Sequence, residues 1–163
     1  MMFIASILVM SLQAFAGPLP APLVPDDSTT GILCTTSDPD FTEFRYDEKI
    51  PYCERNVSPS EKSRIYDHYG IPRNCRHEYT IDHFYPLSLG GNNERGNLWP
   101  EHREIKHSRQ NLEMRLYQAL RAGRVSQRAA LDEIREFKMH PRVEKIISGS
   151  YCDLDLSHFR DEF

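Results

Sequence analysis

Residues 79–100, YTIDHFYPLSLGGNNERGNLWP, limit the fold more than any other part of this chain. They begin with aromatic and β-branched side chains, which are typical of a β-strand. Gly-Gly-Asn-Asn at 90–93 favours a tight turn, because glycine and asparagine tolerate positive φ angles. Asn-Leu-Trp then predicts a returning strand, and Pro100 and Glu101 favour the start of a helix. The stretch therefore predicts strand, loop, strand and helix in close succession.

A short helix is predicted before this stretch. Ser58 has the side chain of an N-cap, Pro59 suits the first helical position, and Glu61 completes a capping box. Gly70 is expected to end the helix.

Two further helices are predicted after it. Apolar residues on one helical face favour a single helix up to Ala122, closed by Gly123. These residues are Ile105, Leu112, Leu116, Ala119 and Leu120. Ser126 predicts the N-cap of a last helix. The order is helix, strand, loop, strand, helix, helix, which indicates an α+β fold.

The amino-terminal residues have the pattern of a signal peptide. MMFIASILVMSLQ is apolar and uncharged, and Ala14 and Ala16 fit an A-x-A cleavage site. The run is shorter than the ~20 residues of a transmembrane helix. We therefore predict a signal peptide at 1–16, a proline-rich linker at 17–31 and one domain at 32–163. The alternative is an apolar anchor or a buried first helix.

Export would place the mature chain in the periplasm or the medium, with no stable membrane association after cleavage. An even number of cysteines in an exported chain predicts disulfides. Of the three pairings that four cysteines allow, we favour Cys34–Cys53 and Cys75–Cys152. The alternative is four free thiols in a reducing compartment.

The charge of the chain is unevenly distributed. Its formal net charge is −4, yet residues 101–145 carry eleven basic and seven acidic side chains. Such a segment can form a local basic face that meets phosphates. The alternative is a solvated helical surface of mixed charge.

Asp82 and His83 are the candidate chemical groups. A carboxylate is a hard oxygen ligand that suits Mg²⁺ or Mn²⁺, and a neutral imidazole suits a general base. Adjacent residues in a regular strand point to opposite faces, so the two side chains would have different jobs. Taken alone, an Asp-His pair is more often a turn cap beside an ordinary histidine.

The pair is part of a longer pattern. Four dipeptides follow one another in order: Asp82-His83, Pro86-Leu87, Gly90-Gly91 and Asn97-Leu98. This pattern resembles the HNH endonuclease family (ββα-metal, or His-Me finger), in its exported bacterial-type branch. The resemblance implies a small ββα-metal core with flanking helices, here stabilised by disulfides. It also implies that His83 is the general base, that Asp82 binds metal, and that Asn97 braces the loop.

The last metal ligand is the open position. The family's usual spacing falls on Lys106, and a protonated lysine cannot bind a metal. We predict His107 as the ligand, with His102 as the alternative. The resemblance implies one divalent ion, with Mg²⁺ favoured and Mn²⁺ or Zn²⁺ as alternatives.

The predicted function is therefore an exported, metal-dependent endonuclease. Its substrate would be nucleic acid, with DNA favoured over RNA and little sequence preference. Arg103, Lys106 and Arg109 could contact DNA phosphates from the helix, and solvated positions are the equal alternative. The alternative is a non-catalytic, secreted DNA-binding protein on a degenerate HNH scaffold. The oligomeric state is left open.

Overall fold

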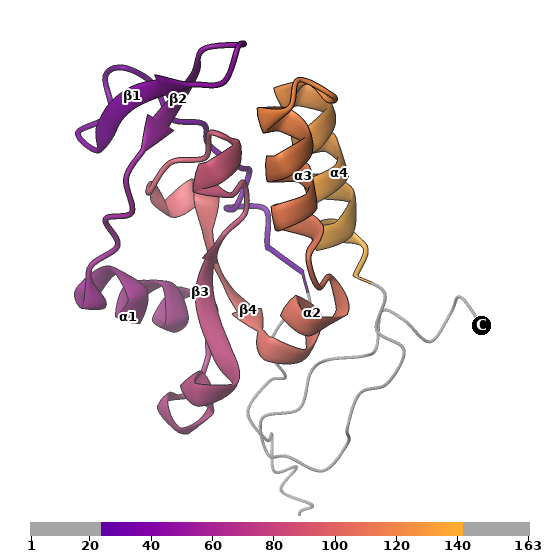
Figure 1. Ribbon diagram of the computed structural model, residues 1–163. Coiled ribbons are helices and arrows are strands. Elements are labelled where there is room, and N and C mark those ends of the chain that lie inside the picture. Colours follow the sequence, from indigo (N-terminus) through magenta and orange to yellow (C-terminus); the bar gives the residue numbers. More distant parts are fainter. Residues whose placement is uncertain (1–23, 142–163) are drawn as a thin grey trace, which may run out of the picture.

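The computed structural model describes residues 24–141 (Figure 1). The predicted signal peptide, the linker up to residue 23, and residues 142–163 with Cys152 lie outside the described residues. Two small antiparallel sheets and several helices make up the described part, so the predicted α+β class is confirmed. None of the helices between residues 24 and 141 has the length and apolar character needed to cross a lipid bilayer.

The first sheet is a hairpin that the sequence analysis did not predict. Strand β1 (Phe41–Arg45) pairs antiparallel with β2 (Ile50–Cys53). The turn between them places Tyr46 and Lys49 at positive φ. A disulfide joins Cys53 to Cys34, with the two sulfurs 2.05 Å apart, as predicted. It ties the end of β2 to the segment that precedes β1.

The second sheet confirms the predicted strand, loop and returning strand. Strand β3 (Tyr79–His83) pairs antiparallel with β4 (Leu98–His102), with Asp82 opposite Trp99 and His83 opposite Leu98. Two single turns of 3₁₀-helix lie in the connecting loop, η2 (Leu87–Leu89) and η3 (Arg95–Asn97).

The predicted helix start at Pro100 and Glu101 is wrong. Both residues belong to β4, opposite Ile81 and Thr80, and helix α2 (Arg103–Ser108) begins after them. The carboxylate of Glu101 is fully buried against Arg109, and this long-range contact outweighs the local preference for a helix start.

Helix α1 (Pro59–His68) has the predicted cap, first residue and end, whereas the carboxylate of Glu61 pairs with Arg64 and Arg95 instead of completing a capping box. The backbone N–H of Glu61 donates to Oγ of Ser58 at 3.1 Å, Pro59 occupies the first position, and Gly70 follows at φ +66°. A 3₁₀-helix, η1 (Arg73–Glu78), then leads into β3.

The single helix predicted up to Ala122 is in fact two. Helix α2 ends at Ser108, and α3 (Leu112–Arg121) begins after Asn111, which has φ 65°. Asparagine is one of the few residues that adopt this left-handed conformation readily. The break lets Arg109 point into the protein, where it meets Asp82 and Glu101. Helix α4 (Gln127–Met139) begins at the predicted Ser126 cap.

The main core lies between the loop after β3 and the helix pair α3 and α4, which run side by side in Figure 1. It contains Ile50, Phe84, Leu89, Leu112, Leu116, Leu120 and Ile134. Trp99 is fully buried and belongs to the interior rather than to a base-stacking surface. The segment before Ile32 already lies against this fold, because Thr29 is buried and Arg135 donates to the carbonyl of Thr30.

Candidate functional site

Asp82 and His83 occupy the end of β3 and have different partners. Asp82 contacts Lys106 of α2, Arg109 after it, and Lys138 of α4. His83 contacts Arg55, which follows the first hairpin, and the loop between β3 and β4. This is the division expected of neighbouring side chains in a strand.

His83 is 2% exposed, and both of its ring nitrogens have a partner. Nδ1 lies 3.3 Å from Nη2 of Arg55, and Nε2 lies 3.0 Å from Oδ1 of Asn93. A guanidinium can only donate, so Nδ1 is the acceptor and Nε2 carries the proton. The imidazole is therefore neutral, with its basic nitrogen toward Arg55.

The orientation of Asn93 is fixed from the first hairpin. Its Nδ2 donates to Oδ2 of Asp40 at 2.9 Å and to the carbonyl of Glu54 at 2.7 Å. The amide oxygen is thereby left to face His83. Residues that flank β1 and β2 thus set the tautomer of a histidine in β3.

The surroundings of His83 favour its neutral form. Burial lowers the pKa of His83, and the positive charge of Arg55 lowers it further, against the opposing effect of the hydrogen bond to Asn93. The net pKa lies below the ordinary imidazole value of 6.5. A histidine of this kind stays an available base at slightly acidic pH.

Asn97 holds the ends of the loop together. Its Oδ1 accepts from the backbone N–H of Tyr85 at 2.8 Å. Its Nδ2 donates to the carbonyls of Tyr85, at 3.0 Å, and Asn92, at 2.8 Å. The side chain is fully buried, so its three polar contacts are with protein alone. These bonds fix the chain two residues after His83 and directly before Asn93, which is a bracing geometry.

The carboxylate of Asp82 is enclosed by cations. Its Oδ1 lies 3.2 Å from Nζ of Lys106, and its Oδ2 lies 2.7 Å from Nη2 of Arg109 and 3.3 Å from Nζ of Lys138. Burial alone would raise the pKa of Asp82, but the charges of Lys138, Lys106 and Arg109 outweigh it and hold that pKa well below its usual range.

Two more carboxylates complete this ionic cluster, which we define as Asp82, Glu101, Glu113, Lys106, Arg109 and Lys138. Glu101 is fully buried and accepts from Nε of Arg109 at 2.9 Å and from Nη2. Glu113 accepts from Nη1 of Arg109 and lies 3.4 Å from Nζ of Lys138. Burial raises the pKa of Glu101 to about 7, and the neighbouring Asp82 adds to the rise while Lys138 and Arg109 oppose it.

The predicted metal ligands do not form a ready site with Asp82. His107 is exposed on α2, and its side chain makes no hydrogen bond or ion pair with any residue between 24 and 141. His102 accepts from the backbone N–H of Glu104 through Nδ1 at 3.2 Å, and its ring packs edge-on against Tyr79. A divalent ion at Asp82 would also meet three cations at close range, which Coulomb repulsion opposes. As they lie, these residues do not fit the divalent ion that the resemblance implies.

Cys34, Asp38 and Cys53 are the one group of three potential metal ligands within 4.8 Å of each other in the described part of the chain. The group could hold a metal ion through two thiolates and a carboxylate. In the structure, however, the two sulfurs are bonded to each other and carry no thiolate charge. Metal binding there would require reduction of the disulfide.

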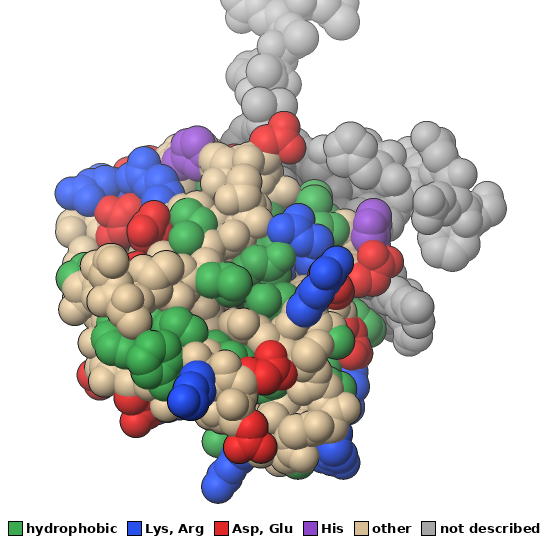
Figure 2. All heavy atoms as spheres, turned by 90° about the horizontal axis from the view of Figure 1, so that it is seen from above, with side chains coloured by type: hydrophobic (Ala, Val, Ile, Leu, Met, Phe, Trp, Pro, Cys, Tyr) green, Lys and Arg blue, Asp and Glu red, His purple; other side chains and the backbone are tan. Residues whose placement is uncertain are grey.

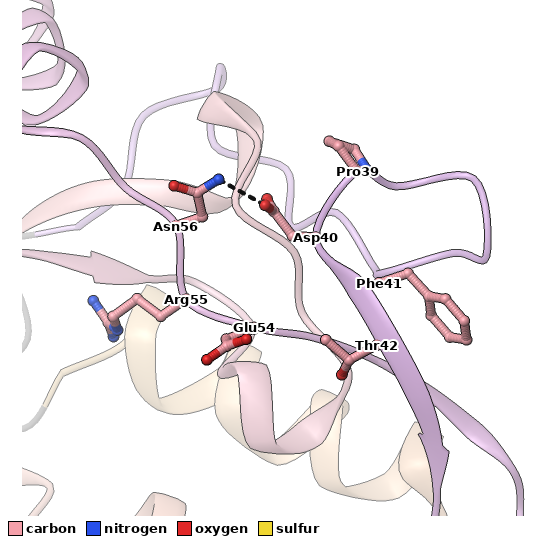
Figure 3. A pocket seen from close by; sticks show the side chains of 7 residues that line it. All are labelled: Pro39, Asp40, Phe41, Thr42, Glu54, Arg55 and Asn56. Carbon is pink, nitrogen blue, oxygen red and sulfur yellow. Dashed lines mark hydrogen bonds between the residues drawn. The ribbon is translucent and has the colours of Figure 1, made fainter.

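An open pocket of about 270 Å³ adjoins the residues that hold His83. Figure 3 shows its lining residues, which are Pro39, Asp40, Phe41, Thr42, Glu54, Arg55 and Asn56. In this view Asp40 and Asn56 face each other and share a hydrogen bond of 2.7 Å. Arg55 belongs both to the lining and to the contacts of His83, so it connects the pocket with the imidazole.

The basic surface expected from the sequence is only partly present. Arg109 is 5% exposed and fully engaged in ion pairs, so the predicted phosphate contact from this residue is wrong. Arg103 and Lys106 remain partly exposed, at 44% and 40% of their side chains, although each is paired with a carboxylate. The face in Figure 2 likewise mixes basic, acidic and hydrophobic side chains without a continuous basic area.

Sequence reasoning missed Arg55, Asn93 and the buried Lys138. Asn93 appeared only as a turn residue, and Arg55 lies 28 positions before His83, beyond any local pattern. One signal was available for Lys138: it follows Ile134 by four residues and therefore lies on the apolar face of its helix.

Comparison with family models, with curated proteins and with solved structures gave no match for this chain. The HNH resemblance therefore rests on the motif residues of the sequence.

Proposed function

We propose that the protein is an exported endonuclease that hydrolyses phosphodiester bonds of nucleic acid, DNA in the first place, with His83 as the general base. The observation that carries the proposal is the fixed neutral tautomer of His83, with Nδ1 toward an arginine at the edge of an open pocket. The order of motif residues and the loop bracing by Asn97 support it.

The reaction follows from these positions. Arg55 is exposed, and its guanidinium can leave Nδ1 of His83 to hold a phosphate oxygen. A water molecule then takes its place beside Nδ1, which accepts a proton as the water oxygen attacks phosphorus. The bond between phosphorus and the departing sugar oxygen breaks, and this oxygen takes a proton from solvent. Asn93 keeps the opposite nitrogen protonated throughout. Asp82 fixes this strand end through the ionic cluster.

Plasmid cleavage by the oxidised chain from Gly17 tests the proposal. We expect nicking that falls at least about 100-fold in His83→Ala, the lower end of what a general base contributes. His140→Ala removes an exposed histidine from the end of α4 and should cleave like the wild type. Intact plasmid from folded wild-type protein, with Mg²⁺, Mn²⁺, Zn²⁺ or EDTA, would contradict the proposal.

The pH dependence of cleavage tests the role of His83 separately. Because its pKa is lowered, more than half of the base should be neutral at pH 6.5, the ordinary imidazole value, and activity there should exceed half of its plateau. Activity should then decline as the pH falls further and the imidazole gains a proton. Initial rates measured across this range provide the check, and a profile that stays flat down to about pH 4.5 would count against His83 as the base.

The pairing of Asp82 with three cations favours a second candidate, a secreted nucleic-acid-binding protein without catalysis. In that case the HNH-like scaffold would bind DNA through exposed basic side chains such as Arg103. A gel shift with intact DNA under every metal condition would identify this function, whereas turnover identifies the enzyme.

A further inference from the structure

The ionic cluster contains one cation that stands between Asp82 and solvent. Lys138 is fully buried, and the side chain of Arg109 is 5% exposed, whereas that of Lys106 is 40% exposed. The ammonium of Lys106 lies 3.2 Å from Oδ1 of Asp82, the oxygen that neither of the other two cations contacts. An ion from solvent would reach Asp82 on this side.

Three carboxyl groups of the cluster face three cations, and each has at least one cation within 3.4 Å. Because the pKa of Glu101 is raised to about 7, the negative charge of the cluster does not exceed its positive charge at neutral pH. No carboxylate charge is left over for a further cation while Lys106 is in place. Without Lys106, two cations would face three carboxyl groups, and the oxygen nearest to solvent would have lost its partner.

We propose that Lys106 closes Asp82 to divalent metal ions, so that the ammonium group supplies beside this carboxylate the positive charge that a metal ion would otherwise supply. The site binds no Mg²⁺ or Mn²⁺ in the wild-type chain, and any cleavage proceeds in EDTA. Replacement of Lys106 by a metal ligand converts the same place into a divalent-metal site. The inference deepens the proposed function and rests on it only for the cleavage measurement.

The test uses Mn²⁺ alone as the probe, with the oxidised chain from Gly17. Calorimetric titration and the shift of the thermal midpoint are measured for wild type, Lys106→His and Lys106→Met. The histidine variant offers Asp82 a second ligand, and the methionine variant removes the same charge without offering a ligand for a hard cation. Lys62→His adds a histidine on the exposed face of α1 and controls for non-specific binding.

We expect Lys106→His to bind one Mn²⁺ per chain at least about tenfold more tightly than wild type, and to gain thermal stability with added metal. Lys106→Met removes the blocking charge without adding a ligand, so it should bind Mn²⁺ more tightly than wild type but less tightly than Lys106→His. Lys62→His should bind no better than wild type. Tight Mn²⁺ binding by wild type that Asp82→Asn abolishes would overturn the proposal. So would a Lys106→His variant that folds and binds no better than wild type, because Lys106 would then not be the group that closes the site.

Cleavage is scored independently of binding. Wild-type nicking that persists in EDTA supports the inference, and nicking that EDTA abolishes and Mg²⁺ restores overturns it. If no variant cleaves under any condition, the proposed function fails, and the Mn²⁺ titrations still decide whether Lys106 closes Asp82.

Discussion

Lys138→Met should lower the free energy of unfolding by about 3 to 5 kcal/mol, the usual cost of removing one partner from a buried ion pair. Lys138 is fully buried on α4, and its ammonium lies 3.3 Å from Oδ2 of Asp82 and 3.4 Å from Oε1 of Glu113. It also donates to the backbone carbonyl of His83. Methionine has a similar length and no charge, so it would remove this donor and a positive charge from the buried cluster, and only Arg109 would remain on these oxygens of Asp82 and Glu113.

Urea denaturation of the two proteins measures this loss. Lys62→Met, on the exposed face of α1, is the matched control and should change the unfolding free energy by at most about 0.5 kcal/mol. A loss below about 1 kcal/mol in Lys138→Met would mean that the ionic cluster contributes little to stability, which is the usual case for exposed rather than buried pairs.

Local signals predicted the elements whose ends are defined by their own residues. The Ser58 and Ser126 caps place the starts of α1 and α4, because each hydroxyl accepts from a backbone N–H three positions ahead. The β3–β4 pair was likewise readable from its aromatic content and its glycine-asparagine turn. The first hairpin carries a similar local signal, since aromatic side chains flank the Asp-Glu-Lys turn.

The parts that could not be predicted depend on contacts between distant segments. The extension of β4 to His102 and the break at Asn111 both bring Glu101 and Arg109 together. The sequence around Glu101 and around Arg109 contains no local pattern that predicts a buried ion pair. The tautomer of His83 is set by a chain of bonds from Asp40 through Asn93. The motif thus identified the residues at the strand end, and only the fold identified their partners.

The two faces of β3 carry different groups: Asp82 of the buried ionic cluster on one side and the proposed base His83 on the other. The ionic cluster holds the Asp82 side, and Lys138 reaches past it to the carbonyl of His83. The first hairpin holds the other side through Arg55 and Asn93. A substitution on either face of β3 should therefore affect His83, so the free energy of unfolding and the pKa of His83 should be measured together in any variant of this region.

Asn97→Asp should change both the free energy of unfolding and the pKa of His83 more than other substitutions in this region. The aspartate has nearly the same shape and can still accept from the N–H of Tyr85, but it loses the amide donor that satisfies the carbonyls of Tyr85 and Asn92. Each buried carbonyl left unpaired costs about 1 to 3 kcal/mol, and a buried carboxylate facing them adds to this. We therefore expect a loss of about 3 to 6 kcal/mol in unfolding free energy.

The exposed Asn74→Asp in η1 is the control for the added charge, and it should lie within about 0.5 kcal/mol of wild type. Where Asn97→Asp remains folded, NMR titration of His83 reports on the loop. Asn93 follows directly after Asn92, so a loosened loop admits water to the imidazole, weakens the burial that lowers the pKa of His83, and should move that pKa toward 6.5. A small stability loss with an unchanged titration would show that the loop keeps its shape without the amide of Asn97.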